Sequence, residues 1–428
     1  MKTSRLSFIS LTSLCYVFLA TIDVDQAVSG DEDANNDVIT RTSRRGGRRC
    51  YGGGRDLLGQ LSSAVTYFSA NLHTTAIVRM PNCIYSPYSV FQALGMTYLG
   101  ARRLTAYEMK KTMSLRTLGR CAHEAIHLAA ANMSQPGGLV LKSANRIYIR
   151  DDVQLADEFQ QTLRSSYNSS IQPLDWDDER GPEGPINDWV SSATEGLIPD
   201  LLLQGTISSD TAMVLVNAIY FKANWTTVFK SSDTTNETFH QPTQQQTTVP
   251  MMHLEGRFRF ARLDDHHAQV LFLPYTGNRF GMFVILPDDI DGLPAVESAL
   301  TSILADSLDS LSSTDVRVSL PKFKLESSFD LKEALIDVGM VRPFSARHAD
   351  FSRMTGRNNL YMSRVIHRAV VDVTETGTEA AGLTAISISL TSFIRSWTDF
   401  KADHPFVFVI RDNLTKIPLF VGKYSGGD

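Results

Sequence analysis

The chain has 428 residues, of which 43% are hydrophobic and 20% charged, so its composition is ordinary for a globular protein with a substantial core. Its formal net charge of -5 argues against a surface that attracts nucleic acid as a whole, and we expect protein partners instead. No linker-like composition divides the part that we expect to fold.

The first thirty residues have the pattern of a secretory signal peptide. Lys2 and Arg5 precede the apolar-rich run 6–20, and small residues follow at 27–30. The run is short and interrupted by Ser and Thr, and no later run reaches the roughly 20 apolar residues that a membrane span needs. We therefore expect residues 1–30 to be a signal peptide and the protein to be secreted and extracellular, with no membrane segment.

Residues 31–55 have the composition of a flexible extension, acidic at 31–37 and then rich in arginine. The arginines are candidates for processing sites or for a patch that binds sulfated polysaccharide, and a plain solvated tail is the alternative. They are Arg41, Arg44, Arg45, Arg48 and Arg49. We expect one folded domain over residues 56–428.

Helical spacing dominates the first third of that domain. Residues 57–72 have it, and a second helix begins at 86–90, where Ser86 or Ser89 can cap the first amides. Short β-branched or aromatic runs, bounded by polar residues or proline, predict later strands at 214–221, 269–273, 281–286, 316–320 and 406–410. This order predicts an α+β fold in which a helical layer covers large sheets.

Asparagine sequons and cysteines fit an exported chain. The candidate glycosylation sites are Asn132, Asn168, Asn224, Asn236 and Asn413. Cys15 falls in the signal segment, which leaves Cys50, Cys83 and Cys121; their pairing is open at this stage. Cys83 lies beside apolar Ile84 and Tyr85, so we expect it to be buried.

One segment matches an enzyme motif. His123, Glu124 and His127 form H-E-x-x-H, which in zinc proteases supplies two metal ligands and a base. The extended motif needs Gly and a third His where this chain has Ala130 and Met133. A zinc metalloprotease is therefore a remote alternative, and we expect no metal, no cofactor and no catalytic residues. Other nucleophile, phosphate-loop and dinucleotide motifs are missing from the sequence.

Residues 372–394 combine features of a loop and of a strand. From 380 to 394 there is no charge and no proline, and small residues alternate with hydroxyl and apolar ones. One face of such a strand carries Thr378, Ala380, Gly382, Thr384, Ile386 and Ile388, which suits burial. The segment is therefore predicted to be an exposed loop that can become a strand.

The chain resembles the serpin family over nearly all of residues 56–423. The segments that carry the resemblance occur in the family's order, and they are 82–90, 99–102, 216–222 with Trp225, 377–381 and 400–406. The resemblance implies the serpin fold: a large central sheet that opens to accept a reactive loop, two smaller sheets and about nine helices.

The resemblance also assigns roles to single residues. Ser86, Ser89, Asn217 and His367 resemble the shutter, a hydrogen-bonded cluster beneath the point where the sheet parts. Trp225, Phe221 and Lys222 resemble the breach, where insertion begins. Glu375, Gly377, Thr378, Ala380, Ala381 and Gly382 resemble the proximal hinge of the loop. Leu383 stands where a smaller residue is usual, but it belongs to the outward face.

Counting seventeen residues from Glu375 inclusive places the reactive bond at Thr391-Ser392. Pro405 then lies fourteen positions further on, a spacing similar to that of antithrombin. Thr391 suits an elastase-like pocket, whereas Leu390, Phe393 and Arg395 offer neighbouring bonds to chymotrypsin-like or trypsin-like proteases.

The function implied is that of a secreted, monomeric suicide inhibitor of serine proteases. The protease would attack the loop, and the freed loop would insert before water could release the acyl bond. A non-inhibitory serpin acting as a carrier, chaperone or storage protein is the main alternative. The small inward face of the hinge favours the inhibitor.

Overall fold

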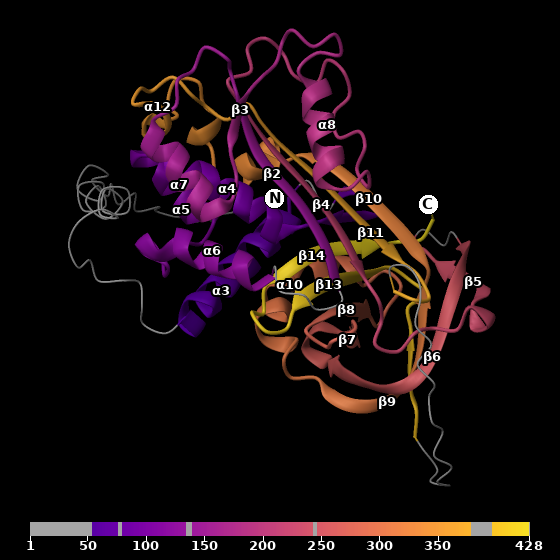
Figure 1. Cartoon of the computed structure of the whole chain (residues 1–428). Coiled ribbons are helices and arrows are strands. Elements are labelled where there is room, and N and C mark those ends of the chain that lie inside the picture. The colour runs from indigo at the N-terminus through magenta and orange to yellow at the C-terminus, as the bar shows by residue number, and fades with distance from the viewer. Residues whose placement is uncertain (1–53, 76–78, 134–138, 243–245, 378–395, 428) are drawn as a thin grey trace, which may run out of the picture.

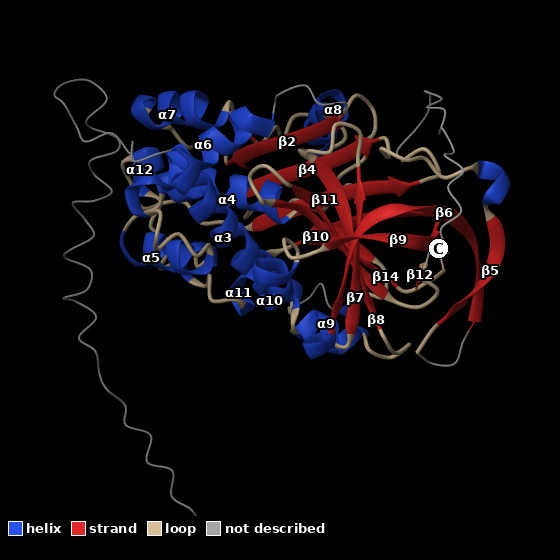
Figure 2. Cartoon of the chain, turned by 90° about the horizontal axis from the view of Figure 1, so that it is seen from below, coloured by secondary structure: helices blue, strands red, loops and turns tan. Residues whose placement is uncertain are grey.

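The computed structural model describes residues 54–75, 79–133, 139–242, 246–377 and 396–427 of the chain. Helices gather at one end of the molecule and strands at the other, with long strands running between them (Figures 1 and 2). No described helix is long and apolar enough to cross a membrane.

Helices dominate the first third of the domain, as predicted. The described α-helices are α3 (Gly54–His73), α4 (Pro87–Gly100), α5 (Arg103–Thr112), α6 (Ala122–Met133), α7 (Asp157–Tyr167), α8 (Glu183–Ala193), α9 (Leu293–Ser298), α10 (Leu300–Ser302), α11 (Lys332–Asp337) and α12 (Ser352–Thr355). The side chain of Ser86 caps α4, because its Oγ accepts a 3.2 Å hydrogen bond from the amide of Ser89.

The central sheet has five strands in the order β10-β11-β4-β2-β3. They are β2 (Leu139–Ile149), β3 (Ile171–Pro173), β4 (Met213–Ala223), β10 (Phe323–Asp330) and β11 (Arg364–Val373). Most of β4 is buried on both faces, which explains why its sequence is a nearly continuous apolar run rather than an alternating one.

The remaining strands form a nine-stranded sheet. They are β1 (Cys83–Tyr85), β5 (Thr235–His240), β6 (Gln246–Leu263), β7 (Ala268–Pro274), β8 (Phe280–Pro287), β9 (Ser312–Pro321), β12 (Thr398–Lys401), β13 (Phe406–Asp412) and β14 (Pro418–Tyr424). The two smaller sheets that we expected are continuous here, because the 18 residues of β6 pair with β5 and β9 along one part and with β7 along another.

Two apolar layers enclose the central sheet. In the larger layer, α3 and α4 lie on one side of the central sheet and pack against β13 and β14. In the smaller layer, Ile186 and Val190 of α8 pack over Val214 and Val216 of β4. Figure 2 shows α8 on the opposite side of the long strands from α3. The central sheet is therefore the middle layer of a three-layer domain.

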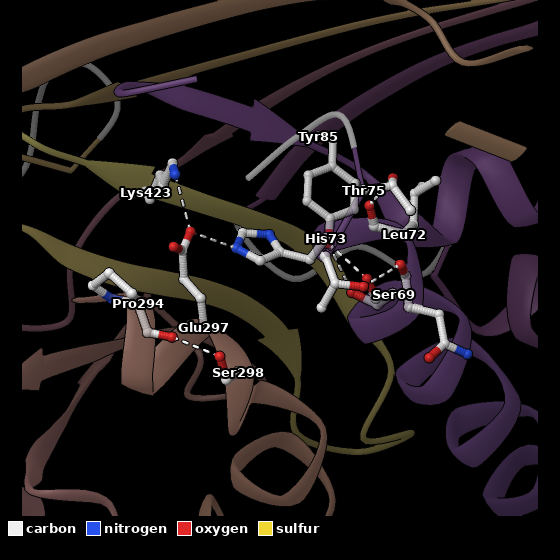
Figure 3. A network of polar contacts seen from close by, with 11 residues as sticks. Ser69, Leu72, His73, Thr75, Tyr85, Pro294, Glu297, Ser298 and Lys423 are labelled. Atoms are coloured by element: carbon white, nitrogen blue, oxygen red, sulfur yellow. Dashed lines mark hydrogen bonds and ion pairs between the residues drawn. The ribbon is translucent and has the colours of Figure 1, made fainter. Parts of the chain in front are cut away.

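A buried polar network joins the helical layer to the strands (Figure 3). Glu297 of α9 lies 3.0 Å from Nε2 of His73, at the end of α3, and 3.0 Å from Nζ of Lys423 on β14. The ring of Tyr85 stacks on His73. Because all these groups are buried, removing one would leave its partners without compensation, so the network fixes α3 and α9 to β14.

Candidate functional site

Strands β4 and β11 lie side by side in the central sheet and run parallel, from the pair Val214 and Arg364 to the pair Phe221 and Val371. Their outer neighbours β2 and β10 pair with them in the antiparallel sense. A strand placed between β4 and β11 and antiparallel to both would replace one parallel pairing by two antiparallel ones. Among the described strands of this sheet, β2 and β3 are also parallel but share only three register pairs, whereas β4 and β11 share eight, so an added strand would gain most at the boundary between β4 and β11.

The shutter residues meet across this boundary. Asn217 of β4 and His367 of β11 are register partners, and Nδ1 of His367 donates to Oδ1 of Asn217. The amide of Ser86 donates to Nε2 of His367 at 2.9 Å, so the ring is neutral and carries its proton on Nδ1. Separating the two strands breaks the bond between Asn217 and His367.

Strand β2 completes the shutter with two residues that the sequence did not single out. Nδ2 of Asn217 donates to Oδ1 of Asn145 and to Oγ of Ser89, and Ser143 lies 3.2 Å from Ser89 Oγ. Asn145 is the register partner of Asn217 on β2, a relation that only the strand pairing shows. The network therefore crosses from β11 through β4 to β2.

Burial controls the charge of His367. The side chain has no exposed surface, and desolvation lowers its pKa to about 3. The Phe329 ring of β10 stacks on it at 6.4 Å. A proton on Nε2 would face the amide of Ser86, so the closed shutter requires a neutral ring.

The hinge begins immediately after β11. Oε2 of Glu375 lies 2.9 Å from Nζ of Lys322, and Thr234 donates to its other oxygen at 3.2 Å. Burial opposes ionisation of Glu375, but the hydrogen bond and charge of Lys322 outweigh it and lower the pKa. Glu375 is therefore an anchored carboxylate, and Lys322 is a partner that the sequence did not reveal.

Gly377 fits against the end of β4 only because it lacks a side chain. Its φ is +106°, and an added Cβ would lie 2.3 Å from the carbonyl oxygen of Ala223. The turn is closed by hydrogen bonds between Thr374 and Gly377, and the amide of Trp225 donates to Thr376 O at 3.1 Å. The hinge thus starts as a tight turn docked on β4.

The breach residues surround this turn. The indole of Trp225 donates to Thr374 O at 2.9 Å and stacks on Tyr275, with ring centroids 4.5 Å apart. Phe221 is buried against Tyr275 on the core side, whereas Lys222 points to the other face of β4 and is half-buried. Trp225 therefore bonds to the backbone that would have to move first.

Helix α8 and the segment after it bridge the boundary on the outer face. Lys142 of β2 pairs with Glu195 at 2.6 Å, and Arg146 stacks on Trp189 at 4.0 Å. On the other side, Arg368 of β11 donates to the carbonyl of Asp200. Since α8 and the segment after it contact both β2 and β11, separation of β4 and β11 would strain or break one of these sets of contacts.

The H-E-x-x-H histidines have other partners. Nδ1 of His123 lies 2.6 Å from the Tyr167 hydroxyl, the ring stacks on Tyr98, and burial lowers its pKa to about 4. His127 lies 3.1 Å from Ser166 O. Within the described ranges no group of three His, Cys, Asp or Glu residues could hold a metal ion, so the geometry gives the zinc-protease alternative no support.

The cysteines and sequons differ in accessibility. The thiol of Cys83 is buried as expected, and burial raises its pKa to about 11, whereas Cys121 is disulfide-bonded. Asn168 and Asn236 are exposed, while three other sequon asparagines, Asn132, Asn224 and Asn413, are partly buried. Asn224 pairs with Gly377, so it lies directly at the hinge.

Several predicted site residues lie outside the described residues. These are the hinge residues Thr378, Ala380, Ala381 and Gly382, the reactive bond Thr391-Ser392, and the arginines Arg41, Arg44, Arg45, Arg48 and Arg49. The described shutter, breach and hinge residues do come together around the boundary between β4 and β11.

Comparison with known proteins agrees with this geometry. Residues 63–426 match the family model described as serpin (serine protease inhibitor). The chain is 36% identical over 377 residues to a leukocyte elastase inhibitor of Homo sapiens, covering 86% of this chain and 99% of that one. A leukocyte elastase inhibitor of Bos taurus is 38% identical over 382 residues, with coverages of 86% and 99%.

Solved structures show the same fold. Uncleaved ovalbumin matches with a TM-score of 0.77 at 29% identity, covering 86% of this chain and all of that one. Serpin48 of the insect Tenebrio molitor, described as a highly specific serpin, matches with a TM-score of 0.76 at 26% identity, covering 89% of this chain and 100% of that one. The chain belongs to the serpin family, and the predictions of a serpin fold and of a protease inhibitor rather than an enzyme are confirmed.

His367 should make stability depend on pH. Its pKa is about 3 in the folded chain and about 6.5 when unfolded, so the unfolded state binds the proton first and stability falls as pH drops below about 6.5. Where the unfolded state binds one proton more than the folded state, the free energy of unfolding falls by about 1.4 kcal/mol per pH unit. His367→Gln keeps one donor and one acceptor but cannot titrate, so it should lose less thermal stability between about pH 7.5 and pH 5.

Thermal unfolding followed by circular dichroism measures this loss. His267→Asn, in an exposed left-handed turn, is the control and should retain the wild-type pH slope. Equal slopes in the wild type and His367→Gln would contradict the role assigned to His367.

Gly377→Ala should displace the hinge from the end of β4. The positive φ and the close carbonyl of Ala223 together predict a loss of about 1–3 kcal/mol, seen as a lower unfolding temperature. Gly59→Ala is the matched control, since a Cβ there has open space within α3 and should stabilise the helix slightly. An unchanged unfolding temperature in Gly377→Ala would mean that the hinge is not held as described.

Proposed function

We propose that the protein is an exported inhibitor of serine proteases that traps its target by inserting its cleaved loop between β4 and β11. One observation carries this proposal: β4 and β11 are parallel neighbours between antiparallel partners, and β11 leads directly into the hinge. After cleavage the loop can turn back at Gly377 and run antiparallel to both strands.

The proposed mechanism has one covalent step. The serine of the protease attacks the carbonyl carbon of Thr391, the bond to the Ser392 nitrogen breaks, and the acyl bond links the protease to the loop. Insertion then carries the tethered protease along the sheet and distorts its active site, so that water no longer completes deacylation. The driving energy is the difference between the parallel-paired sheet and the sheet with an added strand.

An elastase-like or chymotrypsin-like protease is the proposed target. Thr391 is small enough for the shallow pocket of an elastase, and several relatives are named leukocyte elastase inhibitors. Leu390 and Phe393 are the neighbouring positions that a chymotrypsin-like pocket would accept.

Export, glycosylation and a monomeric state belong to the same proposal. The pattern of residues 1–30 supports export, and the exposed positions of Asn168 and Asn236 make these two the best-placed glycan acceptors. The arginines of the extension, Arg41, Arg44, Arg45, Arg48 and Arg49, are proposed as a contact for sulfated polysaccharide.

Incubation of the protein with elastase, chymotrypsin and trypsin tests the inhibitor proposal. A complex that survives denaturing electrophoresis is expected with elastase or chymotrypsin, and mass spectrometry of the released peptide should place its new N-terminus at Ser392. Clean cleavage without a complex would favour the alternative of a non-inhibitory carrier, chaperone or storage serpin.

A charge on the inward face of the hinge should turn the inhibitor into a substrate. Thr378→Arg places a guanidinium among the first residues to enter the sheet, where burial of an unpaired charge opposes insertion. Glu379→Arg is the matched control, because the next residue faces outward in the inserted strand. We expect cleavage without a stable complex for Thr378→Arg and a stable complex for Glu379→Arg; a stable complex with both would contradict the insertion mechanism.

A further inference from the structure

Strand β5 lies at an edge of the nine-stranded sheet. It pairs with β6, and within the described ranges no strand pairs with its other side. Figures 1 and 2 both place β5 at the outer rim of the strand-rich end of the molecule. An edge strand presents N–H and C=O groups that can pair with a strand of another molecule, so the outer side of β5 needs protection.

Asn236 turns its backbone groups away from β6. Its register partner Pro250 has no N–H to donate, and the carbonyl of Pro250 accepts from the amide of Lys322 at 2.8 Å. Lys322 follows β9, which pairs with β6 on the side opposite β5. Asn236 and Pro250 are therefore a non-hydrogen-bonded pair of the antiparallel ladder, and the N–H and C=O of Asn236 face the outer edge.

Thr238 presents its backbone groups to the same edge. Alternate residues of an antiparallel strand direct these groups to the same side, so those of Thr238 and His240 face outward like those of Asn236. The amide of His240 agrees with this assignment, because it donates to Asp403 O at 2.8 Å and not to β6. Asp403 thus covers one end of the edge, and the edge at Asn236 and Thr238 has no partner strand in the described part of the chain.

The sequence of β5 contains none of the usual protections of an edge strand. The segment Thr235–His240 reads TNETFH, without lysine or proline, and its register with β6 is continuous, without a bulge. Its one acidic residue, Glu237, lies on the other face, where it contacts His253 at 2.7 Å and Lys401 at 3.5 Å. Threonine and phenylalanine favour strand pairing, so a bare β5 is a template for another strand.

Asn236 and Thr238 are also the two recognition residues of a glycosylation sequon. Because they are two positions apart in a strand, their side chains lie on the same face, and both are exposed. Within the described ranges no hydrogen bond engages either side chain. By contrast, Nδ2 of Asn132 donates to Leu128 O at 2.8 Å, so a glycan on Asn132 displaces a bond of the folded chain. A glycan on Asn236 displaces none.

We propose that Asn236 carries an N-linked glycan that shields the outer edge of β5 and prevents this strand from pairing with β5 of a second copy of the chain. A bond forms between Asn236 Nδ2 and the anomeric carbon of an oligosaccharide carried on a lipid diphosphate. The bond from that carbon to the diphosphate oxygen breaks, the lipid diphosphate leaves, and the amide gives up one proton.

The position of the glycan explains its effect. A bulky, hydrated glycan on the residue whose own N–H and C=O face the edge keeps an incoming strand at a distance. The inference rests on the proposed export, because this glycosyl transfer accompanies export, and it names the device behind the proposed monomeric state. It does not rest on loop insertion.

Peptide mass spectrometry of the secreted protein tests the modification. An amidase that removes N-glycans converts a glycosylated asparagine to aspartate, so the peptide that contains position 236 should show this conversion. An unmodified Asn236 in the secreted protein would overturn the inference and leave the proposed export intact. Absence of the protein from the medium would overturn both.

Three substitutions of Thr238 separate the effect of the glycan from that of the strand edge. Thr238→Ser keeps the sequon and should remain monomeric. Thr238→Ala loses the sequon but keeps the outward N–H, so its molar mass from size-exclusion chromatography with light scattering should rise towards about twice the monomer value as the concentration increases. Thr238→Pro loses both the sequon and the N–H, so it should be unglycosylated and yet monomeric.

Asn168→Gln removes a sequon elsewhere on the surface and is the control for a general solubilising effect of glycans. It should stay monomeric. A monomeric Thr238→Ala, a Thr238→Pro that associates as strongly as Thr238→Ala, or equal association of Asn168→Gln would each overturn the proposal. Thermal unfolding shows that each variant is folded, and complex formation with protease tests the inhibitor proposal separately.

Discussion

The structure depends on a hydrogen bond between two strands that are 150 residues apart in the chain. His367 of β11 and Asn217 of β4 hold the parallel pair together at its middle, and both groups are fully buried. A buried bond of this kind is costly to break, because each separated group loses its partner without gaining water. In the proposed mechanism this bond is a kinetic barrier that keeps the sheet closed, although an added strand would improve its pairing.

Other contacts help that bond to keep β4 and β11 together. Trp225 and Lys322 hold the hinge at one end of the boundary, and Arg368 holds the segment after α8 across its outer face. All three contacts have to break or shift for a strand to enter, so the energy that closes the sheet is spread over its length. Under the proposed mechanism stability and function are opposed, because the contacts that keep the sheet closed would also slow insertion of the loop.

The sequence predicted local features, such as helix caps and strands, better than contacts between residues that are distant in the chain. The cap of α4 was predicted to be Ser86 or Ser89, and the structure shows that it is Ser86. Apolar runs located β4, β7, β8, β9 and β13 within a few residues. Asn145 was missed because its role comes from the register of β2 on β4, and Lys322 because its partner Glu375 is 53 residues away. Strand β6 was missed because its buried and exposed residues follow no single pattern along its length. One part of β6 pairs with β5 and β9, and another part pairs with β7. The shutter and breach residues were grouped by family resemblance, because the spacing of residues in the sequence does not show which distant residues are in contact.

Thermal unfolding of the protein before and after cleavage in its loop tests the central claim most directly, because the proposed insertion would add a hydrogen-bonded strand between β4 and β11. The account predicts a clearly higher unfolding temperature for the cleaved protein, in spite of the broken chain. An unchanged or lower unfolding temperature after cleavage would show that the loop stays outside the sheet, and would contradict the account.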